Sequence, residues 1–384
     1  MDELDDEVKG VVHDVAIVGA GPAGSAAALR ILQLRPDARV LMLDAATFPR
    51  DKICGDGIAA HVFDLLDALG VHGLAEQAPA VPRLRFRTTS GRSAERACAR
   101  PNRVIRREVF DAALVDAVVA RGGVLRRHRV KTLEVRSDRV VIDGVLAARA
   151  VIGADGANST VRRLLGAPAA APRCTALAVR GYAPEVLDPE TLVIEFADGP
   201  YPAYAWSFPV ADGGANVGYG VFDRRGFGNR REFLDAMRRL LPGQEPRQET
   251  VGGHHLPLST GPRFHPDGRV LLAGDAASMV NPLTGEGIFD AVASGVLAGR
   301  AALAGAAAGA LHRRAMRRCF GRHHRHSGAM ARLAANPRFL DAAVASAGRH
   351  RRVFDAAIDL GLGRGTVPPD ALARVIGAYV GGLV

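Results

Sequence analysis

Hydrophobic residues follow two different spacings along this chain, and each spacing predicts a different kind of element. Near the N-terminus, continuous apolar runs at 14–18 and 39–44 enclose a segment rich in Ala and Leu at 25–34. Such runs are typical of parallel strands covered on both faces, and the segment between them has the composition of a helix. The first part of the chain therefore predicts a strand–helix–strand unit.

Comparable runs at 150–155 and 269–275 predict further buried strands far from this first unit. Between 172 and 255 apolar and polar residues alternate, which predicts an antiparallel sheet. The last part of the chain has a helical pattern. We expect it to break at Asn336-Pro337, because the residue before a proline avoids the helical conformation.

The order of these elements predicts an α/β protein with a Rossmann-like domain, an inserted antiparallel-sheet domain and C-terminal helices. The expected pieces are the Rossmann-like domain at 10–80, 101–165 and 266–300, the sheet domain at 81–100 and 166–265, and the helical region at 301–384. No internal repeat and no low-complexity linker is found. The strands of the first domain are therefore distributed along the chain around the inserted sheet.

Three glycines follow the first predicted strand with G-x-G-x-x-G spacing, namely Gly19, Gly21 and Gly24. In such a turn the first glycine permits the tight bend, the second lets a pyrophosphate approach the backbone, and the third allows close packing of helix on strand. Asp44 ends the second strand at the distance where a carboxylate accepts a ribose hydroxyl. The strand before the turn and the helix after it support dinucleotide binding.

Length and composition exclude several classes of protein. At 384 residues with 48% hydrophobic residues, the chain is not generally disordered and can form two domains. No 18-residue apolar span is found, and the acidic segment 1–9 lacks the apolar core of a signal peptide, so we expect a short disordered lead. The four cysteines form no C-x-x-C pair, which favours a reducing, cytoplasmic setting.

The formal net charge of +10 comes from arginines spread over the whole chain, since only three of the 50 basic residues are lysines. This spread indicates a compositional bias, and no nucleic-acid partner is expected. The densest basic run, 312–326, predicts either a solvated helix face or a surface for an anionic membrane or an acidic redox partner. His323, His324 and His326 in this run are not expected to bind a metal, because no carboxylate or thiolate is spaced to complete a site.

Two short segments have the residue types of a chemical site. The loop after the second strand places Cys54 and Asp56 between glycines, next to one of the few lysines. In the alternating region Tyr204, Trp206 and Phe208 occupy every second position, so on a strand they share one face. Such a row either lines an apolar site or is ordinary sheet core.

Two later turns, Gly-Ala-Asp-Gly at 153–156 and Ala-Gly-Asp-Ala at 273–276, follow the glycine turn in a recognisable order. In this order of turns the chain resembles flavoproteins built like p-hydroxybenzoate hydroxylase, in which these three segments hold FAD. The resemblance implies the fold of these flavoproteins. It also implies that the cofactor is contacted by Gly19, Gly21, Pro22, Ala23, Gly24, Asp44, Arg107, Asp155, Gly274, Asp275, Pro282, Gly285, Glu286, Gly287 and Ile288.

The resemblance also implies where these contacts lie on FAD. The first turn and Asp44 would hold the ADP half, Arg107 would lie on the pyrophosphate side and Asp275 beside the ribityl chain. The glycines at 285–287 would lie at the pyrimidine edge of the flavin, next to a helix N-terminus. A reduced flavin carries negative charge at that edge, which N–H donors and a helix dipole stabilise.

Within this group the sequence is similar to the geranylgeranyl reductase family over nearly the entire chain. The similarity lies in three motifs: Pro49-x-x-Lys52-x-Cys54-Gly55-Asp56-Gly57, Tyr204-x-Trp206-x-Phe208-Pro209 and Gly-Glu-Gly-Ile at 285–288. One departure is Tyr201, where the family usually has proline. The resemblance implies that reduced FAD saturates carbon–carbon double bonds of an isoprenoid, polyprenyl or related hydrophobic substrate.

An isolated alkene has no carbonyl to polarise it, so a hydride delivered to one carbon must be matched by a proton for the other. Cys54 is the candidate proton donor, and Asp56 is either an alternative donor or a residue that orients the loop. The plain alternative for Cys54 is a small thiol without a chemical role. Tyr204, Trp206 and Phe208 are the candidate substrate-binding residues.

No second G-x-G-x-x-G is present, because the glycines of 361–365 have a different spacing. Electrons are therefore expected from transient NAD(P)H docking or from an external reductase or ferredoxin. The main alternative function is an FAD-dependent monooxygenase that hydroxylates or epoxidises a hydrophobic or specialised-metabolite substrate. The residues at Cys54 and Tyr204 disfavour a halogenase, and a flavoprotein with purely structural FAD is a third alternative. A hydrophobic substrate is also compatible with peripheral membrane contact.

Overall fold

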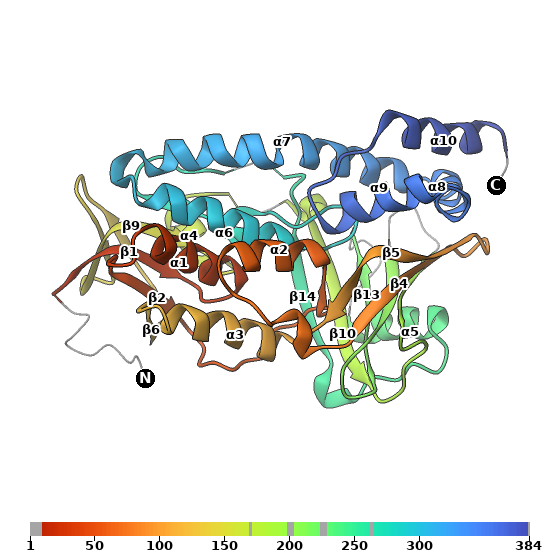
Figure 1. The fold of residues 1–384 in the computed structure, drawn as a ribbon, viewed down its shortest axis with the longest axis horizontal. Coiled ribbons are helices and arrows are strands. Elements are labelled where there is room, and N and C mark those ends of the chain that lie inside the picture. The colour runs from red at the N-terminus through yellow and green to blue at the C-terminus, as the bar shows by residue number, and fades with distance from the viewer. Residues whose placement is uncertain (1–9, 169–170, 198–202, 223–228, 262–263, 383–384) are drawn as a thin grey trace.

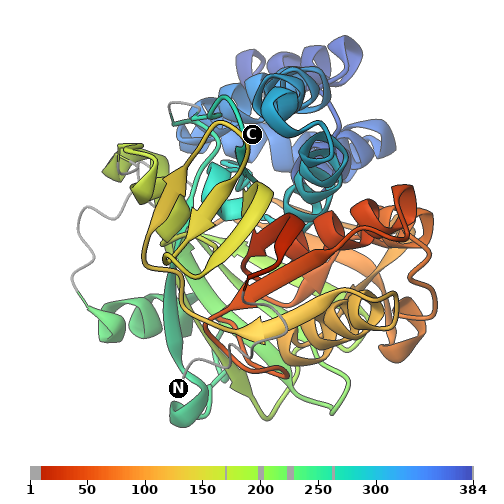
Figure 2. The same cartoon turned by 90° about the vertical axis from the view of Figure 1, so that its left-hand side faces the viewer.

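The computed structural model describes residues 10–168, 171–197, 203–222, 229–261 and 264–382. The expected N-terminal lead at 1–9 and the departure at Tyr201 lie outside these ranges. Within them, the chain forms two sheets that are flanked by helices, and the C-terminal helices lie together along one side (Figure 1). Figure 2 shows the same helices in blue, with the N-terminal strand–helix unit in red and the green strands of the second sheet below them.

The first sheet contains the strands predicted from continuous apolar runs. Its path is β6-β2-β1-β9-β8-β7, and β15 pairs with the end of β9 on the same edge as β8, opposite β1. The pairs among β6, β2, β1, β9 and β15 are parallel. Its strands are β1 (Val12–Val18), β2 (Val40–Asp44), β6 (Val124–Arg127), β7 (Leu133–Val135), β8 (Val140–Ile142), β9 (Leu146–Gly153) and β15 (Val270–Leu272). Strands covered on both faces explain the unbroken apolar runs.

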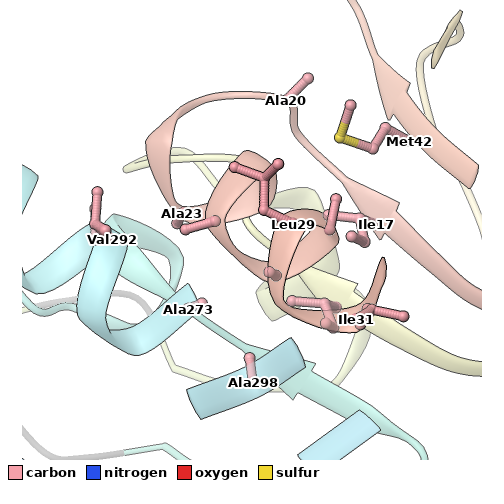
Figure 3. Packing of buried hydrophobic residues seen from close by; sticks show 14 of the residues in the cluster. Ile17, Ala20, Ala23, Leu29, Ile31, Met42, Ala273, Val292 and Ala298 are labelled. Carbon is pink, nitrogen blue, oxygen red and sulfur yellow. The ribbon is translucent and has the colours of Figure 1, made fainter. Parts of the chain in front are cut away.

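Helix α1 (Pro22–Leu34) packs between this sheet and α6 (Ile288–Ala302), as Figure 3 shows. The two helices approach closely because α6 has glycine where a side chain would overlap the backbone of α1, at Gly295 and Gly299. The helix predicted at 25–34 begins earlier, because Pro22 suits the first turn of a helix. Helix α3 (Arg107–Val119) packs against α1, and helix α2 (Ala60–Ala68) packs against α6.

The second sheet has eight strands in the order β14-β10-β13-β12-β11-β4-β5-β3. They are β3 (Gly57–Ile58), β4 (Ala80–Arg87), β5 (Ser93–Val104), β10 (Thr175–Ala183), β11 (Thr191–Phe196), β12 (Ala203–Pro209), β13 (Ala215–Val221) and β14 (Gly252–Pro257). The predicted hairpin forms β4 and β5. The sheet is not wholly antiparallel, because this hairpin joins β11 through the parallel pair β4–β11. The domain boundary expected after residue 100 falls inside β5, and the division into domains stays a prediction.

The remaining helices include the expected C-terminal region. They are α4 (Thr160–Leu164), α5 (Arg230–Leu240), α7 (Ala308–Ala334), α8 (Pro337–Arg349), α9 (Arg351–Leu362) and α10 (Pro369–Val380), with single 3-10 turns at Ala75–Gln77, Pro172–Cys174, Gln248–Thr250, Gly274–Ala277 and Gly305–Ala307. The predicted break is confirmed, since the side chain of Asn336 caps α8. Helices α8 and α9 pack against β5. None of the helices within the described ranges is long and apolar enough to cross a membrane.

Candidate active site

A cavity of about 580 Å³ is lined by the carboxyl ends of β1 and β2 from the first sheet and by residues within β10, β12 and β13 of the second. Most of the predicted site residues line it: Gly19, Gly21, Pro22, Ala23, Asp44, Cys54, Asp56, Arg107, Asp155, Tyr204, Trp206, Phe208, Gly274, Asp275, Gly285, Glu286, Gly287 and Ile288. Among the described residues, the predicted Gly24 and Pro282 do not line it. Segments far apart in the sequence thus share one wall, and we take this cavity as the candidate active site.

The first glycine turn has the geometry that its spacing predicts. Gly19 has a left-handed φ of 99°, and a side chain at Gly24 would overlap the carbonyl oxygen of Gly19. Asp44 closes the turn, because its carboxylate accepts hydrogen bonds from the backbone N–H groups of Ala20 at 2.8 Å and Ala46 at 2.9 Å. Gly24 therefore acts through packing, while Asp44 both stabilises the turn and faces the cavity.

A basic residue that the sequence did not single out, Arg50, lies close to this turn. Its Nη2 lies 3.6 Å from where a β-carbon on Gly21 would be, and its Nη1 lies 2.9 Å from Asp111. The predicted Arg107 is deeper, where its guanidinium donates two hydrogen bonds to Asp111 at 2.8 and 2.7 Å. Burial lowers the pKa of Arg107, but the Asp111 carboxylate outweighs this effect and raises it above its ordinary value. Two arginines thus share one buried carboxylate at the cavity wall.

Two predicted acidic residues are held by neighbouring groups. The Asp155 carboxylate accepts hydrogen bonds from Ser159 Oγ at 2.5 Å and from Thr160 N at 2.6 Å, so it shapes the turn into α4. Burial raises the pKa of Asp155. Asp275 lies 3.5 Å from the ammonium of Lys52, which extends from the cysteine loop. This ion pair joins the cysteine loop to one of the three segments that the resemblance assigned to FAD.

Helix α6 begins at the cavity with the predicted Gly285-Glu-Gly-Ile segment. Gly285 has φ 69°, so its backbone adopts a conformation that favours glycine. The Glu286 carboxylate accepts a hydrogen bond from the N–H of Phe289 at 2.8 Å. Burial and the nearby Asp290 raise the pKa of Glu286 to about 8. At neutral pH this glutamate is therefore mostly uncharged, and it does not add negative charge to the start of α6.

Asp56 is fully buried and is held by two neighbouring strands. Its Oδ2 accepts hydrogen bonds from Tyr182 Oη at 2.5 Å and from Asn216 Nδ2 at 2.8 Å. Asn216 Nδ2 also donates to the carbonyl of Cys54 at 2.8 Å, and Asn216 Oδ1 accepts from the Trp206 indole at 2.9 Å. These bonds fix the loop against β10 and β13, and Asn216 also ties β13 to Trp206 of β12. No local motif marks Tyr182 or Asn216, so sequence reasoning missed both.

The pKa values of Cys54 and Asp56 in this loop are both raised. Burial raises the pKa of Asp56 to about 6, although the hydrogen bonds from Tyr182 and Asn216 lower it. Burial also raises the pKa of the Cys54 thiol, an effect that the charge of Arg107 opposes. The thiol therefore keeps its proton at neutral pH, as a general acid must before it acts.

The aromatic residues of β12 form a row above this loop. The ring centroids of Tyr204 and Trp206 are 6.0 Å apart, and those of Trp206 and Phe208 are 6.5 Å apart. A β-carbon on Gly55 would lie 3.4 Å from the Trp206 indole nitrogen, so the glycine lets the loop lie flat against the row. The hydroxyl of Tyr204 donates to the carbonyl of Thr284, which joins β12 to the loop before α6.

Apolar side chains extend the cavity away from the glycine turns. They come from β4, β11 and α9: Leu84, Phe86, Leu192, Ile194, Ala357, Ile358 and Leu362. The α9 residues belong to the C-terminal helical region, for which the sequence predicted no contact with the site. One end of the cavity is therefore lined by glycine turns and charged groups, while the other is apolar.

The charged end of the cavity fits FAD. Helices α1 and α6 both begin at the cavity with glycine at the N-cap; no side chain caps α1 in the described structure, while in α6 the Glu286 carboxylate accepts from the N–H of Phe289 and leaves other N–H groups of the first turn free. Their free N–H groups are suited to the pyrophosphate and to an electron-rich flavin edge. Arg50 and Lys52 add positive charge beside them.

Comparison with known proteins gives the same result. A family model described as FAD binding domain matches residues 12–195. The menaquinone reductase of Mycolicibacterium smegmatis is 32% identical over 331 residues, which cover 74% of this chain and 75% of that protein. Digeranylgeranylglycerophospholipid reductase 2 of Methanopyrus kandleri is 33% identical over 319 residues, covering 75% and 76% of the two chains. The chain belongs to the geranylgeranyl reductase family of FAD-dependent oxidoreductases.

Solved structures share the fold of this geranylgeranyl reductase family member. A geranylgeranyl bacteriochlorophyll reductase-like protein from Thermoplasma acidophilum superimposes with a TM-score of 0.78 at 20% identity, over 97% of this chain and 98% of that one. The flavin-dependent brominase Bmp2 gives a TM-score of 0.76 at 18% identity, over 97% and 98% of the two chains. The predicted fold class is therefore confirmed, and this scaffold also occurs in enzymes with a different chemistry.

Proposed function

We propose that this FAD-dependent oxidoreductase saturates carbon–carbon double bonds of an isoprenoid, polyprenyl or related hydrophobic substrate. The observation that carries the proposal is the position of Cys54. This protonated thiol lies between the turns that fit FAD and an apolar cavity beneath an aromatic row. Relatives named for the reduction of menaquinone and of digeranylgeranylglycerophospholipid support the same substrate class.

The bound FAD, once reduced, supplies the hydride for one alkene carbon. The chain supplies the rest of the site. The N-termini of α1 and α6 bind the electron-rich parts of the cofactor, helped by Arg50 and Lys52. The apolar wall formed by β4, β11 and α9 excludes water and orients the substrate chain. Tyr204, Trp206 and Phe208 form the aromatic part of this wall.

Cys54 donates the proton that the second alkene carbon requires, and solvent restores the proton to the resulting thiolate. Asp56 positions this loop through Tyr182 and Asn216. A protonated Asp56 is the alternative donor, since its pKa of about 6 leaves part of the population protonated near neutral pH. The two assignments differ in the pH dependence that they predict, because only direct donation by Asp56 would decline as pH rises through 6.

Two partners complete the proposal. Electrons come from NAD(P)H that docks transiently or from an external reductase or ferredoxin, since no second dinucleotide fingerprint is present.

Contact with an anionic membrane surface would use the exposed face of α7, which carries Arg314, Arg317, Arg318, Arg322 and Arg325. Helix α7 contains no acidic residue, and within the described ranges no carboxylate pairs with these five arginines. Binding to vesicles with and without anionic lipid tests this contact.

The decisive experiment uses the FAD-loaded protein under anaerobic conditions. After chemical reduction, geranylgeranyl diphosphate is added, and flavin reoxidation is followed together with the mass of the product. We expect reoxidation coupled to a gain of two hydrogens. Turnover that requires oxygen, with a gain of oxygen in the product, would support the alternative of a monooxygenase.

A matched pair of variants assigns the proton donor. We expect Cys54→Ala to retain FAD and to lose at least tenfold in the rate of alkene reduction, in line with the loss of a general acid. Cys319→Ala is the control, because Cys319 lies on α7 outside the cavity wall. Equal rates in both variants would show that the proton comes from another group.

A further inference from the structure

A second group of titratable side chains lies outside the cavity, where α6 packs on α7. Asp290 of α6 and His323 and His324 of α7 are buried, with exposed fractions of 1%, 2% and 6%. One potential ligand atom from each residue lies within 4.8 Å of those of the other two. The sequence predicted no metal here, because Asp290 lies more than 30 residues before the histidines and only the packing of two helices brings it to them.

The hydrogen bonds of these residues leave two buried acceptor atoms without a partner in the described part of the chain. His323 Nδ1 lies 2.8 Å from the carbonyl oxygen of Gly365, and a carbonyl only accepts. In the neutral ring Nδ1 therefore carries the hydrogen, and Nε2 has a free lone pair. Neither this Nε2 nor Asp290 Oδ1 has a hydrogen-bond partner within the described part of the chain, although both atoms are buried.

Two buried acceptors cannot satisfy each other, since neither has a hydrogen to donate. Leaving both without a partner costs about 1–3 kcal/mol for each neutral group and more for a charge. The third residue, His324, contributes Nε2 at 3.3 Å from the other carboxylate oxygen of Asp290. The arrangement therefore has a place for a cation or for a water molecule that donates twice.

We propose that Asp290, His323 and His324 bind a divalent transition metal of the Zn²⁺ class. Two imidazole nitrogens and one carboxylate oxygen form a donor set that Zn²⁺ accepts, with a water as fourth ligand. The bond from His323 to the Gly365 carbonyl is the outer contact that typically orients a metal-bound histidine. Metal–nitrogen bonds of about 2.0–2.1 Å require the ligand atoms to move inward by roughly 1 Å.

The proposed metal would have a positioning role, because it does not face the FAD cavity. Asp290 lies one turn after Glu286, in the first turn of the helix whose N-terminus faces that cavity. The metal would tie this turn to α7 and, through Gly365, to the segment before α10. It would also neutralise the Asp290 charge, which is one of the groups that raise the pKa of Glu286.

The test measures metal content in the full-length, FAD-loaded protein after removal of any affinity tag. The protein is stripped with a chelator, dialysed against ZnCl₂ and analysed for zinc by mass spectrometry, with MgCl₂ in a parallel sample. We expect one zinc per chain in the wild type and in His326→Ala, whose side chain interacts instead with the N–H of Val367. We expect at least a tenfold loss of bound zinc in Asp290→Asn and in His323→Gln, where circular dichroism checks folding.

A second measurement separates metal from water. Zn²⁺ should raise the melting temperature of the wild type and of His326→Ala, and it should leave that of His323→Gln unchanged. Absence of zinc binding by the wild type would assign the site to water and overturn the proposal. Equal zinc content in the wild type and in both ligand variants would overturn it as well, because the metal would then lie elsewhere.

Discussion

The buried carboxyl of Asp56 offers a direct test of the electrostatics of the cysteine loop. Its pKa rises from 3.8 to about 6 in the folded protein, mainly through burial. A group with a raised folded pKa contributes stability that is fully present below its unfolded pKa of 3.8 and is lost as pH rises through 6. The full effect on the free energy of unfolding is about 3 kcal/mol.

Replacing Asp56 by Asn removes this titration while it keeps the shape of the side chain. The remaining carbonyl oxygen can accept from both Tyr182 and Asn216, since both now donate to the same Asp56 oxygen. The new amide nitrogen takes the place of Oδ1, which has no hydrogen-bond partner among the described residues. Burying this amide nitrogen without an acceptor lowers the free energy of unfolding by about 1–3 kcal/mol, and this cost does not change with pH.

The measurement is the free energy of unfolding in urea at pH 5 and pH 8, for both proteins at the same FAD concentration. Relative to Asp56→Asn, the wild type should lose about 1.4 kcal/mol between these two pH values. In Tyr182→Phe the same transition should move to higher pH, because a hydrogen bond that lowers the pKa of Asp56 is removed. A difference between wild type and Asp56→Asn that stays constant with pH would refute the reasoning.

Three further predictions concern the cofactor end of the cavity. Glu286→Gln should change FAD affinity by no more than about threefold near pH 7, and at pH 9 the variant should bind FAD more tightly than the wild type. The reason is that the glutamate ionises as pH rises through about 8 and then repels an anionic cofactor; fluorescence titration with FAD measures the affinity at each pH. Gly24→Ala should cost about 1–3 kcal/mol in the free energy of unfolding, since its side chain would overlap Gly19, whereas Gly377→Ala on the open face of α10 should gain about 0.5–1 kcal/mol, as urea unfolding would show. Arg50→Ala should weaken FAD binding about tenfold, and an unchanged dissociation constant would place the pyrophosphate elsewhere.

Local sequence was sufficient for features that depend on neighbouring residues. The glycine turn, the parallel strands and the break before Pro337 follow from backbone sterics and from the pattern of burial, which act over a few positions. The order of the three glycine-containing turns resembled that of known flavoproteins, and this resemblance assigned Gly19, Asp155 and Asp275 to one site, whose cavity they line. The cysteine loop and the aromatic row stood out by their residue types, and the resemblance to a family gave them expected roles.

The surroundings of these residues could not be predicted in the same way. Tyr182 and Asn216 hold Asp56 because β10 and β13 pair in one register, and no spacing in the sequence encodes that register. The parallel pair of β4 with β11 was missed for the same reason.

The sequence by itself determined a Rossmann-like unit with a dinucleotide turn and, through its motifs, the family and FAD. Only the tertiary structure decided which groups surround these motifs, because the partners come from strands and helices far along the chain. It placed Arg50 beside the turn, brought α9 to the apolar end of the cavity and set Asp290 close to two histidines. Burial and pKa depend on such distant contacts, and they arise only when the layers pack together.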